Sequence, residues 1–412
     1  MIQIEKALQD QVEIISNGSV VSPRGFSAGG LFCGIRRKRL DLGWIYSYVP
    51  ASAAAVYTTN LFKAAPLKVS KESIDQENRL QGVIVNSGNA NACTGERGLK
   101  DAYTMRDLYA AQMGIEPHLV AVLSTGVIGE FLPMEKIQAG ISRIGSVEQP
   151  ADVVDFEEAI QTTDTCRKSC AVKITIDGKL VSIGGAAKGS GMIHPNMATM
   201  LGFITTDAAI DPASLQQALR QVTNKTFNMI TVDGDTSTND MVLIMANGMA
   251  ENLTLNPSHK EWPKFINALE IVCRSLAKKI ARDGEGASRL VEVTVKGALN
   301  DQVAAHVAKE VIGSNLVKTA IFGADPNWGR IICAIGYSKQ PIDPEKVTVH
   351  IGPIKVVENS LPCGFNEEEA KNYLQQENIH ILIELNQADG QATAWGCDLS
   401  YDYVRINASY RT

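Results

Sequence analysis

The sequence predicts a mixed α/β fold whose sheets contain both hairpins and helical crossovers. Short β-branched and aliphatic runs alternate irregularly with longer segments of helical spacing over the 412 residues, a pattern typical of mixed-sheet α/β or α+β proteins. Asp177-Gly178 separates two of the short runs, and this dipeptide is a strong hairpin signal. The sequence contains no repeat of fixed period and no linker composition, so it sets no domain boundary of its own.

The expected strands are short runs rich in valine, isoleucine and aromatic residues. They are residues 44–49, 82–86, 120–123, 172–176, 180–183, 200–205, 229–232, 241–245, 290–295 and 347–351. Residues 51–59 are expected to form a turn into a further strand. The expected helices carry apolar residues three and four positions apart. They are residues 99–113, 134–144, 156–161, 212–224, 263–281, 301–312 and 367–378.

Composition and charge exclude several classes of protein. Apolar residues make up 45% and charged residues 20% of the chain, the ordinary mix of a globular protein. The formal net charge of −6 gives no general electrostatic reason to bind nucleic acid or an anionic membrane. No apolar run approaches the ~18 residues of a membrane-spanning helix, and the N-terminus lacks the pattern of a secretory signal. We therefore expect a cytoplasmic protein.

The cysteines and histidines give no sign of a metal centre. None of the eight cysteines forms a C-x-x-C pair, and Cys166 and Cys170 have no second pair at zinc-ligand spacing. The six histidines form neither H-x-x-x-H nor H-E-x-x-H. We expect free thiols in a reducing compartment and no bound metal.

The most unusual segment is the glycine-rich run 184–201. It is not a phosphate loop, because Lys188 precedes Gly189-Ser190 instead of following the last glycine. If the bond between Ala198 and Thr199 were cut, the Thr199 hydroxyl would be a nucleophile with its own α-amine as base, and such an amine has a pKa of about 7.7–8.0. On these residues alone, the alternative that Thr199 simply begins a strand stays open.

Collinear blocks along nearly the whole chain resemble ornithine acetyltransferase, also called glutamate N-acetyltransferase, an enzyme family of arginine biosynthesis. The block at the candidate nucleophile joins Lys188-Gly189-Ser190-Gly191-Met192-Ile193 to Pro195-Asn196-Met197-Ala198-Thr199-Met200-Leu201. The other blocks are residues 25–30, 56–60, 64–66, 86–95, 124–129, 162–165, 205–208, 232–240, 283–287 and 324–330. So many blocks in one order point to this family and not to N-terminal nucleophile enzymes at large.

The resemblance implies a layered helix–sheet–sheet–helix fold and an N-terminal nucleophile enzyme that cleaves itself. Thr199 would attack the carbonyl of Ala198 by an N-to-O acyl shift, and water would release the two fragments. Residues 1–198 would form an α chain and residues 199–412 a β chain, intertwined in one body. The expected assembly is an α2β2 heterotetramer.

The resemblance also implies the reaction. Thr199 would take the acetyl group from N2-acetyl-L-ornithine, L-ornithine would leave, and L-glutamate would collect the acetyl group as N-acetyl-L-glutamate. The motifs do not decide whether acetyl-CoA is also accepted as a donor, which would add amino-acid N-acetyltransferase activity. No metal or organic cofactor, no nucleic acid and no membrane is implied.

Site residues follow from the same resemblance. Thr125 and Gly126 would form the oxyanion hole, which needs donors positioned in advance. Lys188 would pair with a substrate carboxylate as a point charge, and Glu285 would hold the amino group of ornithine. The remaining substrate contacts would be Thr162, Asn407 and Thr412. Thr163 is an alternative to Thr162 that the sequence leaves open.

Two loops and two single residues of the sequence also stand out. The loop 233–240 has acidic spacing suggestive of calcium, but its glycine is second and no glutamate follows at position twelve, so we interpret it as turn chemistry. Residues 325–329 are expected to form a turn. His194 and Cys166 depart from the family pattern, and we hypothesise that His194 influences the pH dependence of cleavage.

Two alternative functions remain at this point. One is an aminopeptidase or amidohydrolase with the same nucleophile, in which water receives the acyl group. The pairing of Lys188 with Glu285 suits amino-acid substrates and favours transfer. The other alternative is a ligand-binding protein without catalytic activity that never cleaves itself.

Overall fold

The computed structural model describes residues 12–145, 151–194 and 200–409. The chain forms two compact units. The first comprises Met1–Gly189, Asn196–Asn224 and Thr236–Leu276, and the second comprises Ser190–Pro195, Lys225–Asp235 and Ala277–Thr412.

The first unit is built on a nine-stranded mixed sheet with the order β1-β6-β7-β8-β10-β3-β4-β5, and β2 pairs with β3. Its strands are β1 (Glu13–Ile15), β2 (Phe26–Leu31), β3 (Leu42–Tyr57), β4 (Arg79–Asn89), β5 (Val120–Val127), β6 (Lys168–Ile176), β7 (Lys179–Lys188), β8 (Leu201–Thr206) and β10 (Met241–Ala246). The pairs β4–β5 and β8–β10 are parallel. The predicted hairpin is confirmed, because β6 and β7 pair antiparallel up to Ile176 and Lys179.

The long strand β3 belongs to both halves of this sheet. Its first half pairs with β2 and β4, and its second half, from Ser52 to Tyr57, pairs with β10. The prediction of a turn and a separate strand over 51–59 is wrong, because β3 continues to Tyr57. Pro50 lies where the β3–β4 register shifts between Tyr46 and Ala51, and such an irregularity lets a strand continue through a proline.

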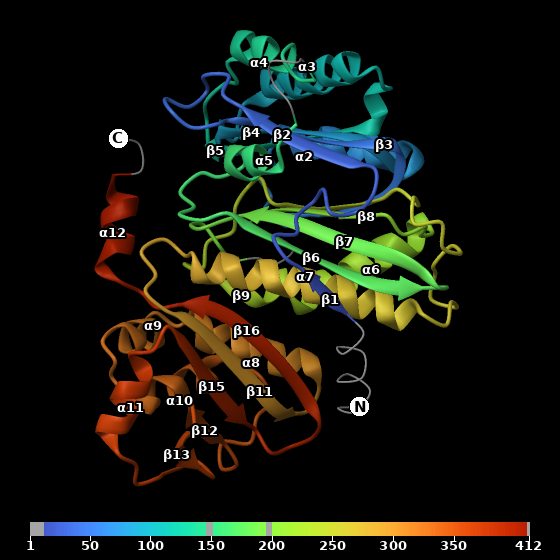
Figure 1. The fold of residues 1–412 in the computed structure, drawn as a ribbon. Helices are drawn as coiled ribbons and strands as arrows, with labels where there is room; N and C mark the ends of the chain where they lie inside the picture. Colours follow the sequence, from blue (N-terminus) through green and yellow to red (C-terminus); the bar gives the residue numbers. More distant parts are fainter. Residues whose placement is uncertain (1–11, 146–150, 195–199, 410–412) are drawn as a thin grey trace. The chain divides into compact units, whose positions relative to one another are not determined.

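The sheet folds into two layers with helices outside them. Figure 1 shows α3 and α4 above the layer of β2, β3, β4 and β5, and α6 and α7 below the layer of β6, β7 and β8. The helices of this unit are α2 (Ala65–Glu77), α3 (Gly95–Met113), α4 (Met134–Ile141), α5 (Val153–Ala159), α6 (Pro212–Lys225) and most of α7 (Trp262–Arg282). The predicted helix–sheet–sheet–helix arrangement is confirmed.

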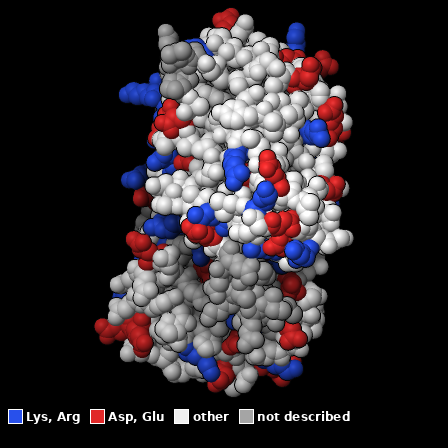
Figure 2. All heavy atoms as spheres, turned by 45° about the vertical axis from the view of Figure 1, so that its right-hand side comes forward, with Lys and Arg blue, Asp and Glu red and all other residues white. Residues whose placement is uncertain are grey.

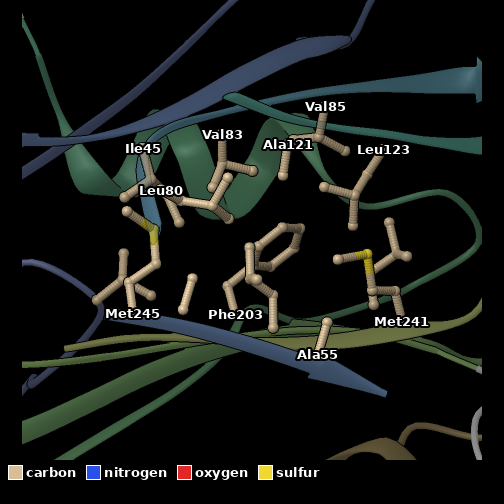
Figure 3. Close-up of a cluster of buried hydrophobic side chains, with 14 of the residues drawn as sticks. Ile45, Ala55, Leu80, Val83, Val85, Ala121, Leu123, Phe203, Met241 and Met245 are labelled. Carbon is tan, nitrogen blue, oxygen red and sulfur yellow. The ribbon is translucent and has the colours of Figure 1, made fainter. Parts of the chain in front are cut away.

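A buried apolar cluster fills the space between the two layers (Figure 3). Phe203 of β8 and the β10 residues Met241 and Met245 face Val83 and Leu123 of the opposite layer. Fully burying one such side chain stabilises the fold by about 1.5–3 kcal/mol. The cluster therefore holds β8 and β10 against the β4–β5 pair, which fixes the start of β8.

The second unit contains a seven-stranded sheet with the order β14-β13-β12-β15-β11-β16-β9. Its strands are β9 (Ile230–Thr231), β11 (Leu290–Ala298), β12 (Thr348–Ile351), β13 (Ile354–Glu358), β14 (Leu361–Pro362), β15 (Asn378–Glu384) and β16 (Gly390–Cys397). Its helices are α8 (Asp301–Gly313), α9 (Asn315–Phe322), α10 (Trp328–Tyr337), α11 (Glu367–Leu374) and α12 (Tyr401–Ala408). Helix α8 packs on β11 and β16, where Gly396 leaves room for Ile312.

The second unit holds most of the differences from prediction. The turn predicted over 325–329 ends at Asn327, because α10 begins at Trp328. The helix predicted over 367–378 ends at Leu374, and Asn378 already belongs to β15. Helix α9 and strand β16 were not predicted, since neither has a long periodic pattern.

The surface charges and the apolar content of the helices are those of an ordinary globular protein. On the face drawn in Figure 2, acidic and basic side chains are interspersed. Within the described residues, no helix is long and apolar enough to cross a membrane. Over the same ranges, no group of three or more His, Cys, Asp or Glu side chains is placed to hold a metal ion.

Candidate active site

The parallel strands β4 and β5 end side by side, and the predicted oxyanion residues lie at this edge. Thr125 is 9% exposed and stands opposite Ser87 in the strand register. Gly126 has φ +137°, and a Cβ there would lie 2.3 Å from the carbonyl carbon of Gly88. Only glycine fits such a close approach of two backbones, so glycine is required at position 126.

Asn239 fastens the loop before β10 to this edge. Its Nδ2 donates to the carbonyl oxygens of Ala90 at 2.6 Å and Ser124 at 2.8 Å. Ser124 in turn donates its hydroxyl to Asn86 Oδ1 at 2.6 Å. These buried bonds hold the peptide unit between Ser124 and Thr125 in one geometry, as a preorganised donor site needs.

Lys188 contacts two of the other predicted site residues, Thr162 and Thr125. It is the last residue of β7 and is 8% exposed. Its Nζ donates to Thr162 Oγ1 at 2.9 Å and to Thr125 Oγ1 at 3.4 Å. One ammonium group therefore joins a candidate substrate contact to a candidate oxyanion residue within the first unit.

Thr162 and Thr163 differ sharply in position. Thr162 accepts the Lys188 hydrogen bond, whereas Thr163 lines an open surface groove together with Lys38, Arg39 and the exposed Cys166. Of the two threonines that the sequence could not separate, Thr162 is the one beside Lys188.

Asp164 is a functional candidate that sequence reasoning missed. Its side chain is fully buried and accepts hydrogen bonds from Lys168 Nζ at 2.7 Å, from the Gly189 amide at 2.7 Å and from the Thr162 amide at 3.0 Å. Lys188 Nζ lies 4.0 Å away. Burial alone would raise the pKa of Asp164, but Lys188, Lys168 and the Thr162 amide hold it well below its usual range.

Asp164 interacts with two lysine side chains. It is ionised at neutral pH and faces Lys168 and Lys188. Lys168 is fully buried, whereas Lys188 is 10% exposed, so Lys188 is the one of the two that could present its charge to a substrate carboxylate. The only sequence signal for this arrangement was the Thr-Thr-Asp-Thr block and the spacing of Asp164 and Lys168 four residues apart.

In the second unit, the predicted residues Glu285 and Asn407 are in direct contact. Asn407 Nδ2, from α12, donates to Glu285 Oε2 at 2.7 Å. The Glu285 amide donates to the Ser190 carbonyl at 3.1 Å. Gly191 leaves the space that this carboxylate occupies, because a Cβ there would lie 2.4 Å from Glu285 Oε2. A buried carboxylate held by an amide can accept an ammonium group.

Asp233 organises the segment that leads toward the candidate cleavage position. Its carboxylate accepts from the amides of Met192 at 2.7 Å and Ile193 at 2.8 Å. His194 Nδ1 lies 2.9 Å from Thr231 Oγ1. Burial and the nearby Lys309 lower the pKa of His194 to about 4, so this histidine is neutral near pH 7. The turn interpretation of 233–240 agrees with the hydrogen bonds of Asp233 and Asn239.

Three predicted residues lie outside the described ranges. Ala198 and Thr199 belong to 195–199, and Thr412 belongs to 410–412. Their roles stay predictions.

Comparison with known proteins identifies the family. A family model described as the ArgJ family matches residues 27–412. A protein of Oceanobacillus iheyensis named arginine biosynthesis bifunctional protein ArgJ is 59% identical over 409 residues, which cover 99% of this chain and 100% of the relative. A protein of the same name from Bacillus subtilis is 57% identical over 412 residues and covers 100% of both chains. The chain belongs to the ArgJ family.

Membership of the ArgJ family confirms the resemblance seen in the motifs. The chain is an acetyltransferase of arginine biosynthesis, as predicted from those blocks. A crystal structure of arginine biosynthesis bifunctional protein argJ from Bacillus halodurans is 60% identical, with a TM-score of 0.51, and covers 52% of this chain and 100% of the crystallised chain. In this ArgJ-family chain, the two described clusters contain Thr125, Gly126, Thr162 and Lys188 in one unit and Glu285 and Asn407 in the other.

Proposed function

We propose that the chain cleaves itself between Ala198 and Thr199, and that Thr199 then carries the acetyl group from N2-acetyl-L-ornithine to L-glutamate. The observation that supports this most directly is the position of Lys188 Nζ between the hydroxyls of Thr162 and Thr125, at 2.9 and 3.4 Å. A cation between the candidate substrate contact and the candidate oxyanion residue suits an acyl donor that is also an anion.

Lys188 and Thr162 would bind the α-carboxylate that acetylornithine and glutamate share. The 2.9 Å hydrogen bond from Lys188 Nζ to Thr162 Oγ1, which brings both groups to one place, supports this role. Thr125 and Gly126 would donate hydrogen bonds to the oxygen that becomes negative when Thr199 attacks the acetyl group. Removal of one such donor typically costs about 10²–10³ in rate.

Glu285 would hold the amino group of ornithine, and Asn407 would keep the Glu285 carboxylate oriented through its 2.7 Å hydrogen bond. Thr412 would contribute through its hydroxyl or its terminal carboxylate.

The length of the proposed β chain agrees with the share of this chain that the crystallised relative covers. Residues 199–412 number 214, and 214 of 412 is 52% of the chain, which is the share that the crystallised relative covers over its full length. In the first unit, β8 and β10 follow Thr199 in sequence and share a sheet with seven strands that precede it. Cleaved halves would therefore stay joined by strand pairing.

The remaining parts of the proposal concern assembly and donors. We propose an α2β2 heterotetramer in the cytoplasm that works without a metal or organic cofactor. Acetyl-CoA is proposed as a second acetyl donor, because the relatives are named bifunctional. All proposed binding partners are small molecules, namely acetylornithine, glutamate and acetyl-CoA, and neither nucleic acid nor a membrane is among them.

Intact-mass spectrometry tests the cleavage. Wild-type protein should give two fragments whose masses add to that of the 44.4 kDa precursor plus one water. Thr199→Ala should stay a single chain, and Thr199→Ser should be cleaved. A single wild-type band that is stable to incubation would overturn the proposal and favour a ligand-binding protein.

A transfer assay tests the acceptor and the donor. Cleaved enzyme is given acetylornithine with and without glutamate, and acetyl-CoA in a separate reaction. Release of ornithine that requires glutamate supports transfer. Equal release of acetate and ornithine without glutamate would instead support the hydrolase alternative.

A further inference from the structure

The guanidinium group of Arg36 binds the backbone of the segment that carries Thr162. Arg36 is a half-buried residue of the loop between β2 and β3. Its Nη1 donates to the Gln161 carbonyl oxygen at 2.7 Å, and its Nη2 donates to the Thr162 carbonyl oxygen at 3.2 Å. A guanidinium presents its donors in a rigid planar fork, whereas a lysine ammonium is a single point charge. The fork therefore holds two consecutive peptide carbonyls in one position.

The aliphatic stem of Arg36 lies against the strand edge that carries the proposed oxyanion residues. Gly88 of β4 stands opposite Gly126 of β5 in the strand register. A Cβ at Gly88 would lie 2.8 Å from Arg36 Cγ, so the absence of a side chain at Gly88 leaves room for the Arg36 stem. One side chain thus contacts the β4–β5 edge with its stem and the Thr162 segment with its guanidinium.

A buried carboxylate fixes the backbone from which Arg36 extends. Asp41 is 0% exposed. Its carboxylate accepts hydrogen bonds from the amides of Cys33 at 2.7 Å, Gly34 at 3.1 Å and Arg36 at 2.9 Å. Hydrogen bonds from amides to a carboxylate are among the stronger ones in proteins. The Asp41 carbonyl oxygen also accepts a hydrogen bond from the Ser87 amide of β4 at 2.9 Å. The loop that carries Arg36 is therefore anchored to β4.

The proposed acetyl donor contains a nearly fixed distance that the site has to match. In N2-acetyl-L-ornithine, the α-carboxylate and the acetyl carbonyl are joined only through the α-carbon and the amide nitrogen. Their separation varies little, because the amide is planar. Thr162 would bind the carboxylate, and Thr125 and Gly126 would face the acetyl oxygen. The Thr162 segment and the β4–β5 edge therefore have to lie at a matching distance.

We propose that Arg36 is a positioning residue that sets this distance, a role that rests on the proposed function. Its guanidinium fixes the Thr162 backbone, its stem rests on Gly88, and Gly88 stands opposite Gly126. Arg36 acts through Thr162 in this role and does not itself bind the donor. A donor acylated on its α-amino group is thereby bound with its carboxylate and its acetyl oxygen in place at the same time.

Steady-state kinetics on cleaved enzyme test this role. Arg36→Met keeps an unbranched stem over Gly88 but has no N–H donors, so the Thr162 segment loses its anchor. Since a misplacement of about 1 Å can cost about 10²-fold, we expect the KM for acetylornithine to rise about 10–100-fold. Arg36→Lys keeps the charge but not the fork, so its KM should lie between those of wild type and Arg36→Met. Arg37→Met is the matched control from the same loop, because Arg37 is exposed, and its KM should change less than twofold.

A double-mutant cycle separates positioning from a role in folding. Residues that act through one another have non-additive effects. On the Thr162→Val background no hydroxyl is left to misplace, so adding Arg36→Met should raise the KM further by less than twofold. A role in folding alone would lower the amount of active enzyme, and so kcat, equally in both backgrounds and would leave KM unchanged. If Arg36→Met gives no cleaved enzyme, the same cycle is measured with Arg36→Lys.

Three outcomes overturn the positioning role. They are a wild-type KM in both Arg36 variants, an equal rise in KM with and without Thr162→Val, and loss of cleavage in both Arg36 variants, which would place Arg36 in folding or maturation. Failure of the proposed function gives a different result. In that case Thr162→Val alone leaves the KM for acetylornithine unchanged, or Thr199→Ala is still cleaved, so the two failures are distinguishable.

Discussion

Lys188 Nζ lies 2.9 Å from Thr162 Oγ1, whereas the adjacent Thr163 lines a surface groove. The two neighbouring threonines therefore provide a test variant and its matched control. Thr162→Val removes a hydrogen bond to a charged group, which contributes about 1.5–3 kcal/mol. We expect a KM for acetylornithine raised by about 10–150-fold, measured by steady-state kinetics on cleaved enzyme. Thr163→Val should change KM less than twofold, and the reverse ranking would exclude Thr162 as the substrate contact.

Asp164 and Lys168 form a buried ion pair at 2.7 Å, and neither side chain is exposed. Asp164→Asn leaves the Lys168 ammonium buried without its counter-charge, which costs about 3–5 kcal/mol. We expect the variant to unfold at a clearly lower denaturant concentration, while the slope of the unfolding free energy against denaturant concentration stays unchanged. Asp75→Asn is the control, because Asp75 pairs with Lys71 at the same spacing on an exposed surface, where a pair contributes about 0–1 kcal/mol. Equal losses of stability in the two variants would show that the buried ion pair contributes no more than the exposed one.

The same carboxyl sets a pH dependence of stability. The folded pKa of Asp164 is held below its unfolded value of 3.8, so its contribution is present above about pH 3.8 and is lost as the pH falls through the folded pKa. Wild-type protein should therefore lose stability in acid more steeply than Asp164→Asn. Urea titrations at successive pH values measure this, and parallel curves for the two proteins would contradict it.

The sequence predicted elements whose conformation depends on neighbouring residues in the chain. It did not predict features that depend on contacts between distant segments. The Asp177-Gly178 hairpin and the strand predicted over 120–123 follow from short-range backbone preferences, although β5 continues to Val127. Asp164 was not singled out, because a carboxylate four residues before a lysine is normally a solvated pair. Its burial results from β7 and the 162–168 segment meeting in the folded chain.

Gly126 should tolerate no side chain. A Cβ at Gly126 would lie 2.3 Å from the Gly88 carbonyl carbon, and its φ is +137°, so Gly126→Ala must move the β4–β5 edge and displace the proposed oxyanion donors. We expect kcat/KM to fall at least about 10²-fold. Gly129→Ala has the matched backbone strain, with φ +87° but no atom within 4 Å of the added carbon. A comparable loss of activity in Gly129→Ala would attribute the effect to strain alone.

His194 should not set the pH dependence of cleavage near neutrality. Burial and Lys309 lower its pKa to about 4, so the side chain is uncharged throughout the range above pH 5. His194→Gln keeps a polar group beside Thr231 and should give the wild-type cleavage profile from pH 6 to 9. A shifted profile in that range would restore the hypothesis that this histidine controls processing.

Asn407 should act on substrate affinity through Glu285. Asn407 Nδ2 donates to Glu285 Oε2 at 2.7 Å, and Asn407→Leu removes that donor without adding charge. The Glu285 carboxylate then loses its fixed orientation, so we expect KM for acetylornithine to rise about tenfold, as one hydrogen bond to a charged group predicts. The half-life of the acetyl-enzyme should stay unchanged. Arg405→Ala is the control on the same helix, because Arg405 is exposed and pairs at the surface with Asp402. A fall in kcat with unchanged KM would instead place Asn407 in the chemical step.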